Sequence, residues 1–238
     1  MRMEDQIARD LSSNLGIGMK EIYSSENPLP DEIFNKVEEK VEEMSLLPIF
    51  YVDNMGSAVE IKETILSFVR TRKLQEEDKG LIVTIDHTLL TKGGRSDAEK
   101  SRVDELYLTL VELKKYFSYQ NIKVTFVLLS QLNRDIQSNE RVTNPKLHYP
   151  TQNDLFASSS AYQSSDYVVI LSRPSVISGM GMYYGPGREN FPHGLPVFHP
   201  STGKAMIYLH VIKERFGTPI IISCVEDFKN NKIIETNV

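Results

Sequence analysis

An aspartate stands where an apolar segment of the chain ends. Leu81–Ile85 is a nearly continuous apolar run, and Asp86 follows it directly. Such a run predicts a strand that is covered on both faces, and ligands of α/β proteins bind at the carboxyl ends of such strands. A carboxylate at that position can organise Mg²⁺ beside a triphosphate. It can also simply cap the following turn, and Asp86 alone leaves both interpretations open.

A polar block follows a second apolar segment. Val124–Leu129 predicts another strand, and Ser130-Gln131-Leu132-Asn133-Arg134 comes after it. Because the ends of parallel strands meet at one edge of a sheet, we expect this block to lie at the same edge as Asp86. The Gln131 amide could then hydrogen-bond a γ-phosphate oxygen or its attacking water, and so report loss of the phosphate. The alternative is a polar turn without a ligand.

Two basic residues close a third segment with strand character. Lys213 and Arg215 are two positions apart, after the strand predicted from Ala205 to Ile212. If that strand continues, both side chains point to one face. Two cations on a rigid face suit negative charge that develops on a phosphate, and arginine can engage it with two donors. A solvated strand end is the alternative, and the order of all three blocks favours the functional interpretation.

Several glycines resemble a phosphate loop without its context. Gly179-Met180-Gly181 and Gly185-Pro186-Gly187 follow no clean strand and precede no helix. Ser201–Ala205 lacks the upstream glycine and the Ser or Thr that should follow Lys204. The 238 residues therefore contain no recognisable cradle for a triphosphate.

Helical and strand patterns alternate along the chain, which predicts the α/β class with a largely parallel sheet. We expect one domain over residues 1–238, with long irregular loops at about 134–153 and 172–204. Further expected elements are a helix opened by Pro30-Asp31, a strand at Pro48–Asp53, a helix capped by Ser57 and Glu60, a long helix from about Asp97 to Tyr119, a strand at Tyr167–Leu171 and a closing hairpin from Ile220 to Ile234.

Composition is that of an ordinary globular domain. The net charge of −5 argues against a surface that is basic throughout, although a local basic groove remains possible. Cys224 is the single cysteine, so no internal disulfide can form. The chain has neither an N-terminal signal region nor an apolar run long enough to cross a bilayer, and we expect a cytoplasmic protein without membrane partners.

The polar blocks occur in the order found in one helicase family. Leu81–His87 is similar to a Walker B strand, and Ser130–Arg134 spells that family's SQLNR block. Asp154-Leu155, Gln163 and Asp166 resemble its DLRESG and EQDAD segments, and Lys213–Pro219 resembles its KxRNG-P block. The sequence thus resembles the RecA-like C-terminal domain of DnaB-type replicative helicases.

This resemblance implies a RecA-like core that is incomplete at its N-terminal, phosphate-loop side. Met1–Arg9 looks like the residues after the family's SLEM block, so the phosphate-loop Lys and Thr and the water-activating Glu would lie upstream of Met1. ATP and Mg²⁺ are the implied cofactors, with Asp86 at the metal, although the chain alone is expected to bind ATP weakly. Gln131, Lys213 and Arg215 take the positions of the phosphate sensor, the trans-acting lysine and the arginine finger.

The resemblance also implies a hexameric ring around single-stranded DNA, with primase or a helicase loader as further partners. The loops that would face the channel contain basic residues that could follow the strand's phosphates, and Phe156 could stack on a base. These residues are Lys92, Arg95, Arg134, Arg141 and Lys146. Phe156-Ala157 replaces the family's Arg-Glu, and Phe216 replaces an Asn.

Two functions from different classes remain at this point. The first is the distal part of a ring-forming, ATP-dependent replicative DNA helicase, phage-like or bacterial, whose phosphate loop lies outside these residues. The second is a catalytically inactive RecA-like module that binds a helicase, a loader or single-stranded DNA. The presence of Asp86, Gln131, Lys213 and Arg215 favours the first.

Overall fold

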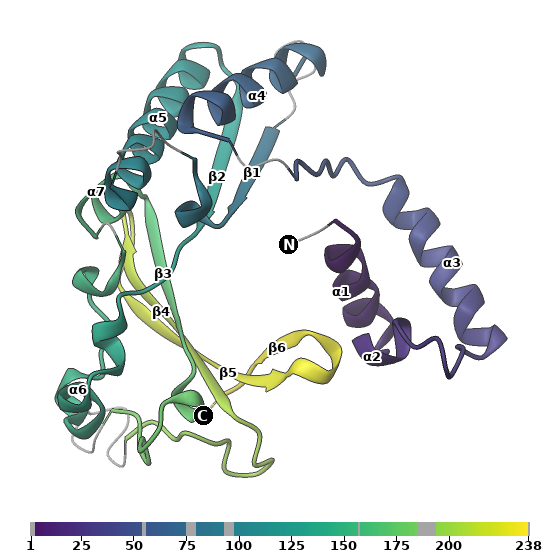
Figure 1. The fold of residues 1–238 in the computed structure, drawn as a ribbon. Helices are drawn as coiled ribbons and strands as arrows, with labels where there is room; N and C mark the ends of the chain where they lie inside the picture. The colour runs from purple at the N-terminus through teal and green to yellow at the C-terminus, as the bar shows by residue number, and fades with distance from the viewer. Residues whose placement is uncertain are drawn as a thin grey trace. The chain divides into compact units, whose positions relative to one another are not determined.

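The computed structural model describes residues 3–53, 56–74, 80–92, 98–156, 158–184 and 194–237 (Figure 1). Two compact units are distinguished. The first comprises the described residues of 1–54, 171–209 and 221–238, and the second those of 55–170 and 210–220. The helices are α1 (Met3–Leu15), α2 (Met19–Ile22), α3 (Asp31–Ser45), α4 (Ala58–Thr71), α5 (Glu99–Tyr119), α6 (Asn139–Thr143) and α7 (Ser158–Ser164). The strands are β1 (Gly80–Asp86), β2 (Lys123–Leu129), β3 (Tyr167–Ser172), β4 (Met206–Glu214), β5 (Ile220–Asp227) and β6 (Lys232–Glu235).

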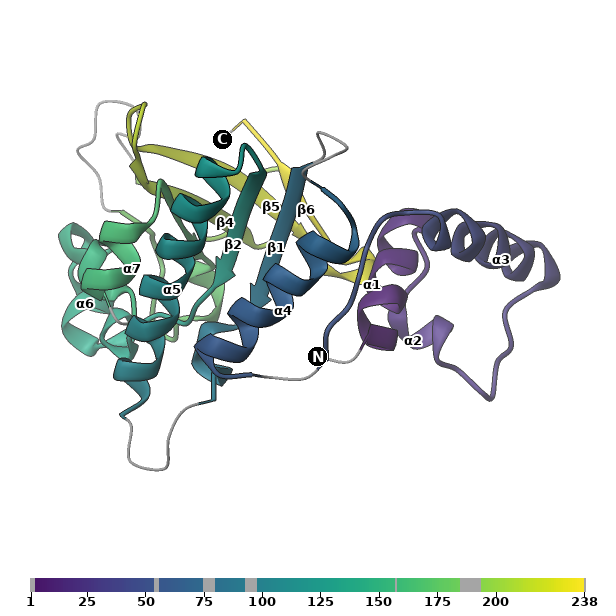
Figure 2. The same cartoon turned by 90° about the horizontal axis from the view of Figure 1, so that it is seen from above.

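Strands β1 and β2 form a parallel pair in the second unit. Their register runs from Gly80 opposite Lys123 to Asp86 opposite Leu129, so both strands end at the same level. Helices α4 and α5 lie over one face of the pair (Figure 2). The α/β class predicted from the sequence is confirmed.

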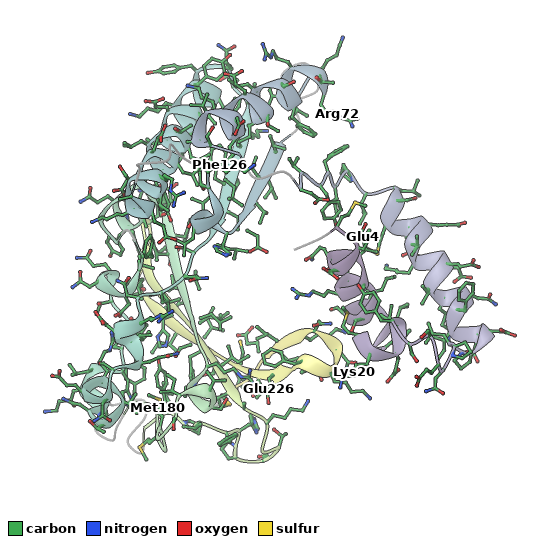
Figure 3. All side chains as sticks on the ribbon, viewed as in Figure 1. Glu4, Lys20, Arg72, Phe126, Met180 and Glu226 are labelled. Atoms are coloured by element: carbon green, nitrogen blue, oxygen red, sulfur yellow. The ribbon has the colours of Figure 1, made fainter. Side chains whose placement is uncertain are left out.

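The core of this unit is built from the apolar stripes of α4 and α5. Leu106, Leu110, Leu113 and Phe117 of α5 are buried against α4, and Phe126 of β2 packs on the same cluster (Figure 3). Helix α4 begins where the sequence predicted. The Ser57 hydroxyl accepts a bond from the Glu60 amide at 3.3 Å, and the Glu60 carboxylate accepts one from the Ser57 amide at 2.7 Å. These two bonds satisfy amides that the first helical turn leaves free.

The expectation that β1 is covered on both faces is wrong. Its residues alternate between half-buried and exposed, and Ile82 is 72% exposed. Val127 and Leu129 of β2 are exposed as well. Successive side chains of a strand point to opposite faces, and α4 and α5 cover only one of them within the described residues.

The predicted strand at Pro48–Asp53 is also not formed. This segment has no regular secondary structure, and its apolar side chains, such as Ile49 and Val52, are exposed. A strand requires a neighbour with which to share a hydrogen-bond ladder. No strand of the described part of the chain pairs with this segment.

Strands β3 to β6 make a second sheet in the order β3-β4-β5-β6. The closing hairpin is confirmed: β5 and β6 pair antiparallel, with Cys224 opposite Glu235. In the first unit the Glu226 carboxylate pairs with Arg173, whose guanidinium lies 4.5 Å from the centre of the Phe228 ring. Among the described residues no helix is both long and apolar enough to cross a membrane.

Candidate functional site

The parallel register places the first two candidate groups at one edge of the sheet. Asp86 ends β1 opposite Leu129, the last residue of β2, and Ser130-Gln131 follow immediately. The side chains of Asp86 and Gln131 are both exposed. The structure therefore places Asp86 and the start of the Ser130–Arg134 block at the same strand-end edge, as the sequence predicted.

Buried polar side chains hold the start of the Ser130–Arg134 block. Thr88 follows the end of β1 by two residues and is fully buried. Its hydroxyl donates to the Ser130 hydroxyl at 3.3 Å. Ser130 also hydrogen-bonds the phenol of Tyr107, a buried residue of α5. Burial raises the pKa of Tyr107 above its ordinary value, and the bond from Ser130 opposes that shift. Sequence reasoning missed Thr88 and Tyr107, because neither lies in a polar block.

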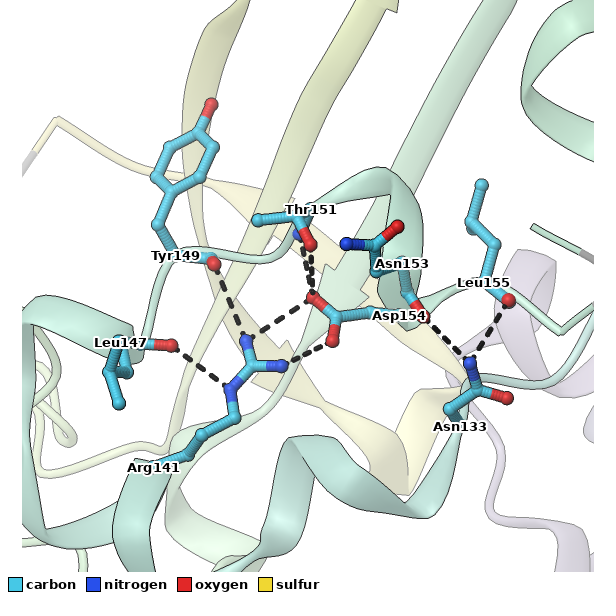
Figure 4. Close-up of polar contacts among 8 residues, drawn as sticks. All are labelled: Asn133, Arg141, Leu147, Tyr149, Thr151, Asn153, Asp154 and Leu155. Carbon is cyan, nitrogen blue, oxygen red and sulfur yellow. Dashed lines mark hydrogen bonds and ion pairs between the residues drawn. The ribbon is translucent and has the colours of Figure 1, made fainter. Parts of the chain in front are cut away.

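The rest of the block is bridged to the segment around Asp154. Leu132 and Leu155 form an antiparallel bridge, and the Phe156 amide donates to the Gln131 carbonyl at 3.3 Å. The Asn133 side-chain amide donates to the carbonyls of Asn153 at 2.7 Å and Leu155 at 3.2 Å (Figure 4). The Ser130–Arg134 block and the segment around Asp154, which the sequence matched separately, are thus hydrogen-bonded to each other. These bonds fix the backbone on either side of Gln131.

Arg141 and Asp154 form a buried ion pair beside this bridge (Figure 4). The guanidinium contacts both carboxylate oxygens, with Nη2 3.2 Å from Oδ2, and also donates to the carbonyls of Leu147 at 3.0 Å and Tyr149 at 3.4 Å. The Asp154 side chain is 4% exposed and that of Arg141 is 17% exposed. Arg141, expected to track DNA phosphates, is thus engaged inside its own loop.

The basic pair near the end of β4 gathers around a second aspartate. Arg215 approaches Asp166 with Nε 3.0 Å from Oδ1, and its backbone amide donates to the Asp166 carbonyl at 3.0 Å. Lys114 of α5 pairs with the other carboxylate oxygen, Oδ2. The hydrogen bond from Lys114, helped by the charge of Arg215, lowers the pKa of Asp166.

Lys213 lies beside this group and turns toward α7. Its ammonium donates to the Tyr162 carbonyl and, at 3.4 Å, to the Gln163 carbonyl, and it lies 4.9 Å from the centre of the Tyr162 ring. Burial, followed by the charge of Arg215, lowers the pKa of Lys213. The two cations therefore lie near each other, although β4 ends at Glu214, one residue before Arg215.

The remaining candidate DNA contacts are more scattered. Lys92, Arg134 and Lys146 are exposed, and the Lys92 amide donates to the Gly56 carbonyl at 3.1 Å. Phe156 is half-buried against the core cluster that includes Leu155 and Val168. Arg95 and the glycine segment 185–187 lie outside the described residues.

The donors available for a metal are few. Within the described residues no three His, Cys, Asp or Glu side chains are grouped closely enough to hold an ion by themselves. Mg²⁺ commonly takes one or two carboxylates and completes its shell with water and phosphate oxygens. Asp86 fits that limited role, since its carboxylate is exposed at a strand end, whereas a phosphate cradle is not among the residues of this chain.

Comparison with known proteins shows the family of the chain. The sequence model of the DnaB-like helicase C-terminal domain family matches residues 1–219. The replicative DNA helicase DnaB of Mycobacterium leprae is 27% identical over 176 residues, which are 73% of this chain and 26% of the relative. DnaB of Mycobacterium intracellulare is 26% identical over the same share of this chain and 27% of its own length. The chain thus spans about a quarter of the curated relatives that it matches.

Two solved structures share the fold. One is a DnaB-like replicative helicase, described with its interactions with primase, at a TM-score of 0.69 and 19% identity over 98% of this chain and 48% of that one. The other is an isolated ATPase domain, at a TM-score of 0.70 and 18% identity over 100% of this chain and 72% of that one. The RecA-like core expected from the sequence is confirmed by these folds. With a family match over more than nine-tenths of its length, the chain belongs to the DnaB-like helicase C-terminal domain family.

Proposed function

We propose that this chain is the distal part of a ring-forming, ATP-dependent replicative DNA helicase core, phage-like or bacterial, within a single RecA-like domain. The observation that carries the proposal is the register of β1 and β2. Asp86 is level with Leu129, two residues before Gln131, at the edge where α/β folds bind ligands. The matched order of polar blocks and the family membership support the same function.

Each polar residue then has a distinct task. Asp86 would hold Mg²⁺ through its carboxylate, and a bound metal would supply positive charge that stabilises phosphoryl transfer. Gln131, on a backbone fixed from both sides, offers its amide to a phosphate oxygen or to the attacking water. Lys213 and Arg215 serve a neighbouring subunit, where their charge stabilises the transition state of that subunit's ATP.

The nucleotide and the partners follow from these tasks. ATP binding requires the backbone amides and the lysine of a phosphate loop, and the 238 residues contain no such loop. The phosphates of ATP are therefore held by a segment outside these residues. A trans-acting pair requires a ring, which we take to be a hexamer, around single-stranded DNA. Primase is a proposed partner because the structurally similar helicase interacts with it. A helicase loader is the other candidate partner.

Arg215→Ala tests the proposal in a protein that joins these residues to the phosphate-loop segment of a DnaB-like helicase. ATP binding should remain nearly intact, because the arginine acts on a neighbour's nucleotide. DNA-stimulated turnover should fall by about 10³-fold or more. Lys213→Ala should act in the same direction but less severely, since an ammonium lacks the two-donor fit.

Mixed rings provide the control for misfolding. Variant subunits added to wild-type rings should poison the neighbouring site, so activity falls in step with the variant fraction. Wild-type turnover by folded Arg215→Ala rings would refute the trans role. It would favour the alternative, a non-hydrolysing module that binds a helicase, a loader or single-stranded DNA.

A further inference from the structure

Asp166 occupies a central place among the basic residues near the end of β4. It lies between α7 and β3, and its two carboxylate oxygens are engaged by cations from two other parts of the chain. Arg215, just after β4, approaches Oδ1, and Lys114 of α5 approaches Oδ2. The backbone joins the same two segments through the bond from the Arg215 amide to the Asp166 carbonyl. Both the main chain and the side chain of Arg215 are therefore held at one point.

This ion pair is made through Nε and leaves the terminal guanidinium nitrogens of Arg215 for another partner. The closest approach is made by Nε, at the inner side of the guanidinium, and the Arg215 side chain is 48% exposed. The terminal nitrogens, Nη1 and Nη2, supply the two parallel donors that suit a phosphate. A carboxylate at Nε can thus fix the direction of the side chain without occupying those donors.

Lys114 links this support to a core helix. It ties Asp166 to α5, a 21-residue helix that is packed into the core through Leu110, Leu113 and Phe117. Lys114 and Arg215 together hold the pKa of Asp166 below its ordinary value, so the carboxylate stays ionised at neutral pH. An arginine on a flexible stem loses rotamer freedom when it binds, and a preset direction reduces that loss.

We propose that Asp166, braced by Lys114, is a positioning residue that orients Arg215 for a phosphate on a neighbouring subunit. This inference rests on the proposed trans role of Arg215, and it assigns to Asp166 no contact with the nucleotide itself. The opposite role, a lock that holds Arg215 back, predicts the reverse change in activity and is separated by the second experiment below.

The first experiment measures the order of the Arg215 side chain in the 238-residue chain by ¹⁵N relaxation of its Nε–H group. In the wild type the order parameter of the Arg215 Nε–H group should lie well above about 0.6, the upper limit for flexible groups. In Asp166→Asn, which keeps the backbone carbonyl, it should fall below about 0.6. Glu112→Gln is the matched control, since Glu112 is another carboxylate in an ion pair, on the same helix as Lys114, and pairs with Lys62 at 3.8 Å. An order parameter that does not change in Asp166→Asn would overturn the proposal.

The second experiment uses the phosphate-loop fusion described above and separates kcat from KM. Asp166→Asn should lower kcat by about threefold to tenfold, less than the loss in Arg215→Ala, and leave KM for ATP unchanged. Asp166→Glu should restore part of the rate, and the double variant with Arg215→Ala should be no slower than Arg215→Ala alone. A purely structural role would raise KM and lower the melting temperature as well. A higher kcat in Asp166→Asn would overturn positioning in favour of a lock.

The two proposals fail in different ways. If Arg215→Ala retains the wild-type rate, the trans role is refuted whatever Asp166 does to the order of the side chain. If Arg215→Ala is slow while Asp166→Asn changes neither the order parameter nor kcat, the trans role stands and the positioning role is wrong.

Discussion

Replacing Arg141 with alanine separates two roles for that residue. The sequence placed Arg141 among the residues that follow DNA phosphates, whereas the structure engages its guanidinium with Asp154 and with the carbonyls of Leu147 and Tyr149. If the internal contacts dominate, Arg141→Ala should lower the free energy of unfolding. If DNA contact dominates, it should lower affinity for single strands and leave stability unchanged.

The expected magnitude follows from what the substitution leaves behind. Removing one member of a buried ion pair costs about 3–5 kcal/mol, because the remaining charge loses its partner away from water. Two features reduce this cost: Arg141 is 17% exposed, and Asp154 keeps bonds from the Thr151 amide at 2.6 Å and hydroxyl at 3.3 Å. We therefore expect Arg141→Ala to lose about 2–4 kcal/mol of unfolding free energy.

Urea denaturation of the 238-residue chain, followed by circular dichroism, measures this loss. Hydrogen exchange should place it in residues 131–156, where the ion pair and the bridge to Leu132 lie. Arg134→Ala is the matched control, since Arg134 is exposed in the same loop, and it should change stability by less than about 0.5 kcal/mol. Adding Asp154→Asn to Arg141→Ala should recover part of the loss, because no charge is then left buried.

One result would refute this reasoning. If Arg141→Ala is as stable as the wild type within about 0.5 kcal/mol and weakens single-strand binding as much as Arg134→Ala does, the ion pair is not structural. Arg141 would then act as the DNA contact that the sequence indicated.

Three further predictions concern nucleotide, DNA and the core. Titration calorimetry of the 238-residue chain should detect no micromolar binding of Mg·ATP, because the amides and lysine of a phosphate loop are absent from its sequence, and micromolar binding would contradict this. Fluorescence anisotropy should show weak single-strand binding that falls with salt, with Lys146→Ala reducing the salt slope by about one; salt-independent or duplex-selective binding would count against the DNA-facing loops. In urea denaturation, Leu106→Ala should lower the free energy of unfolding by about 2–5 kcal/mol because Leu106 is fully buried. Ile82→Ala should lower it by less than about 1 kcal/mol because Ile82 is 72% exposed. Equal losses would show that the face of β1 that carries Ile82 is covered in solution.

The sequence predicted correctly those elements that are determined by residues close together in the chain. The capping box at Ser57 and Glu60 lies within one helical turn, and α5 follows from apolar residues that recur with the helical period between Val103 and Phe117. The two strands that end at Asp86 and Leu129 were read from continuous apolar runs, and their shared edge follows from parallel pairing alone. The spacing of Lys213 and Arg215 indicated only that the two cations lie near each other, since the strand that should have carried both ends at Glu214.

Tertiary structure decided what depends on partners far along the chain. A strand forms only when a neighbour offers its ladder, so the apolar residues of Pro48–Asp53 could not reveal that no described strand pairs with them. A continuous apolar run in β1 could not show that, among the described residues, helices cover one face of the strand and leave the other exposed.

The same limit applies to charged groups. Arg141 and Arg134 have the same charge and lie in the same loop, yet folding brings Asp154 to Arg141 and leaves Arg134 exposed. Arg215 meets Asp166, far earlier in the chain, because β3 and β4 are neighbours in the sheet. Residue types determined which chemistry was possible, and long-range contacts determined which charges were already paired within the chain, because an ion pair depends on distance in space rather than on distance in sequence.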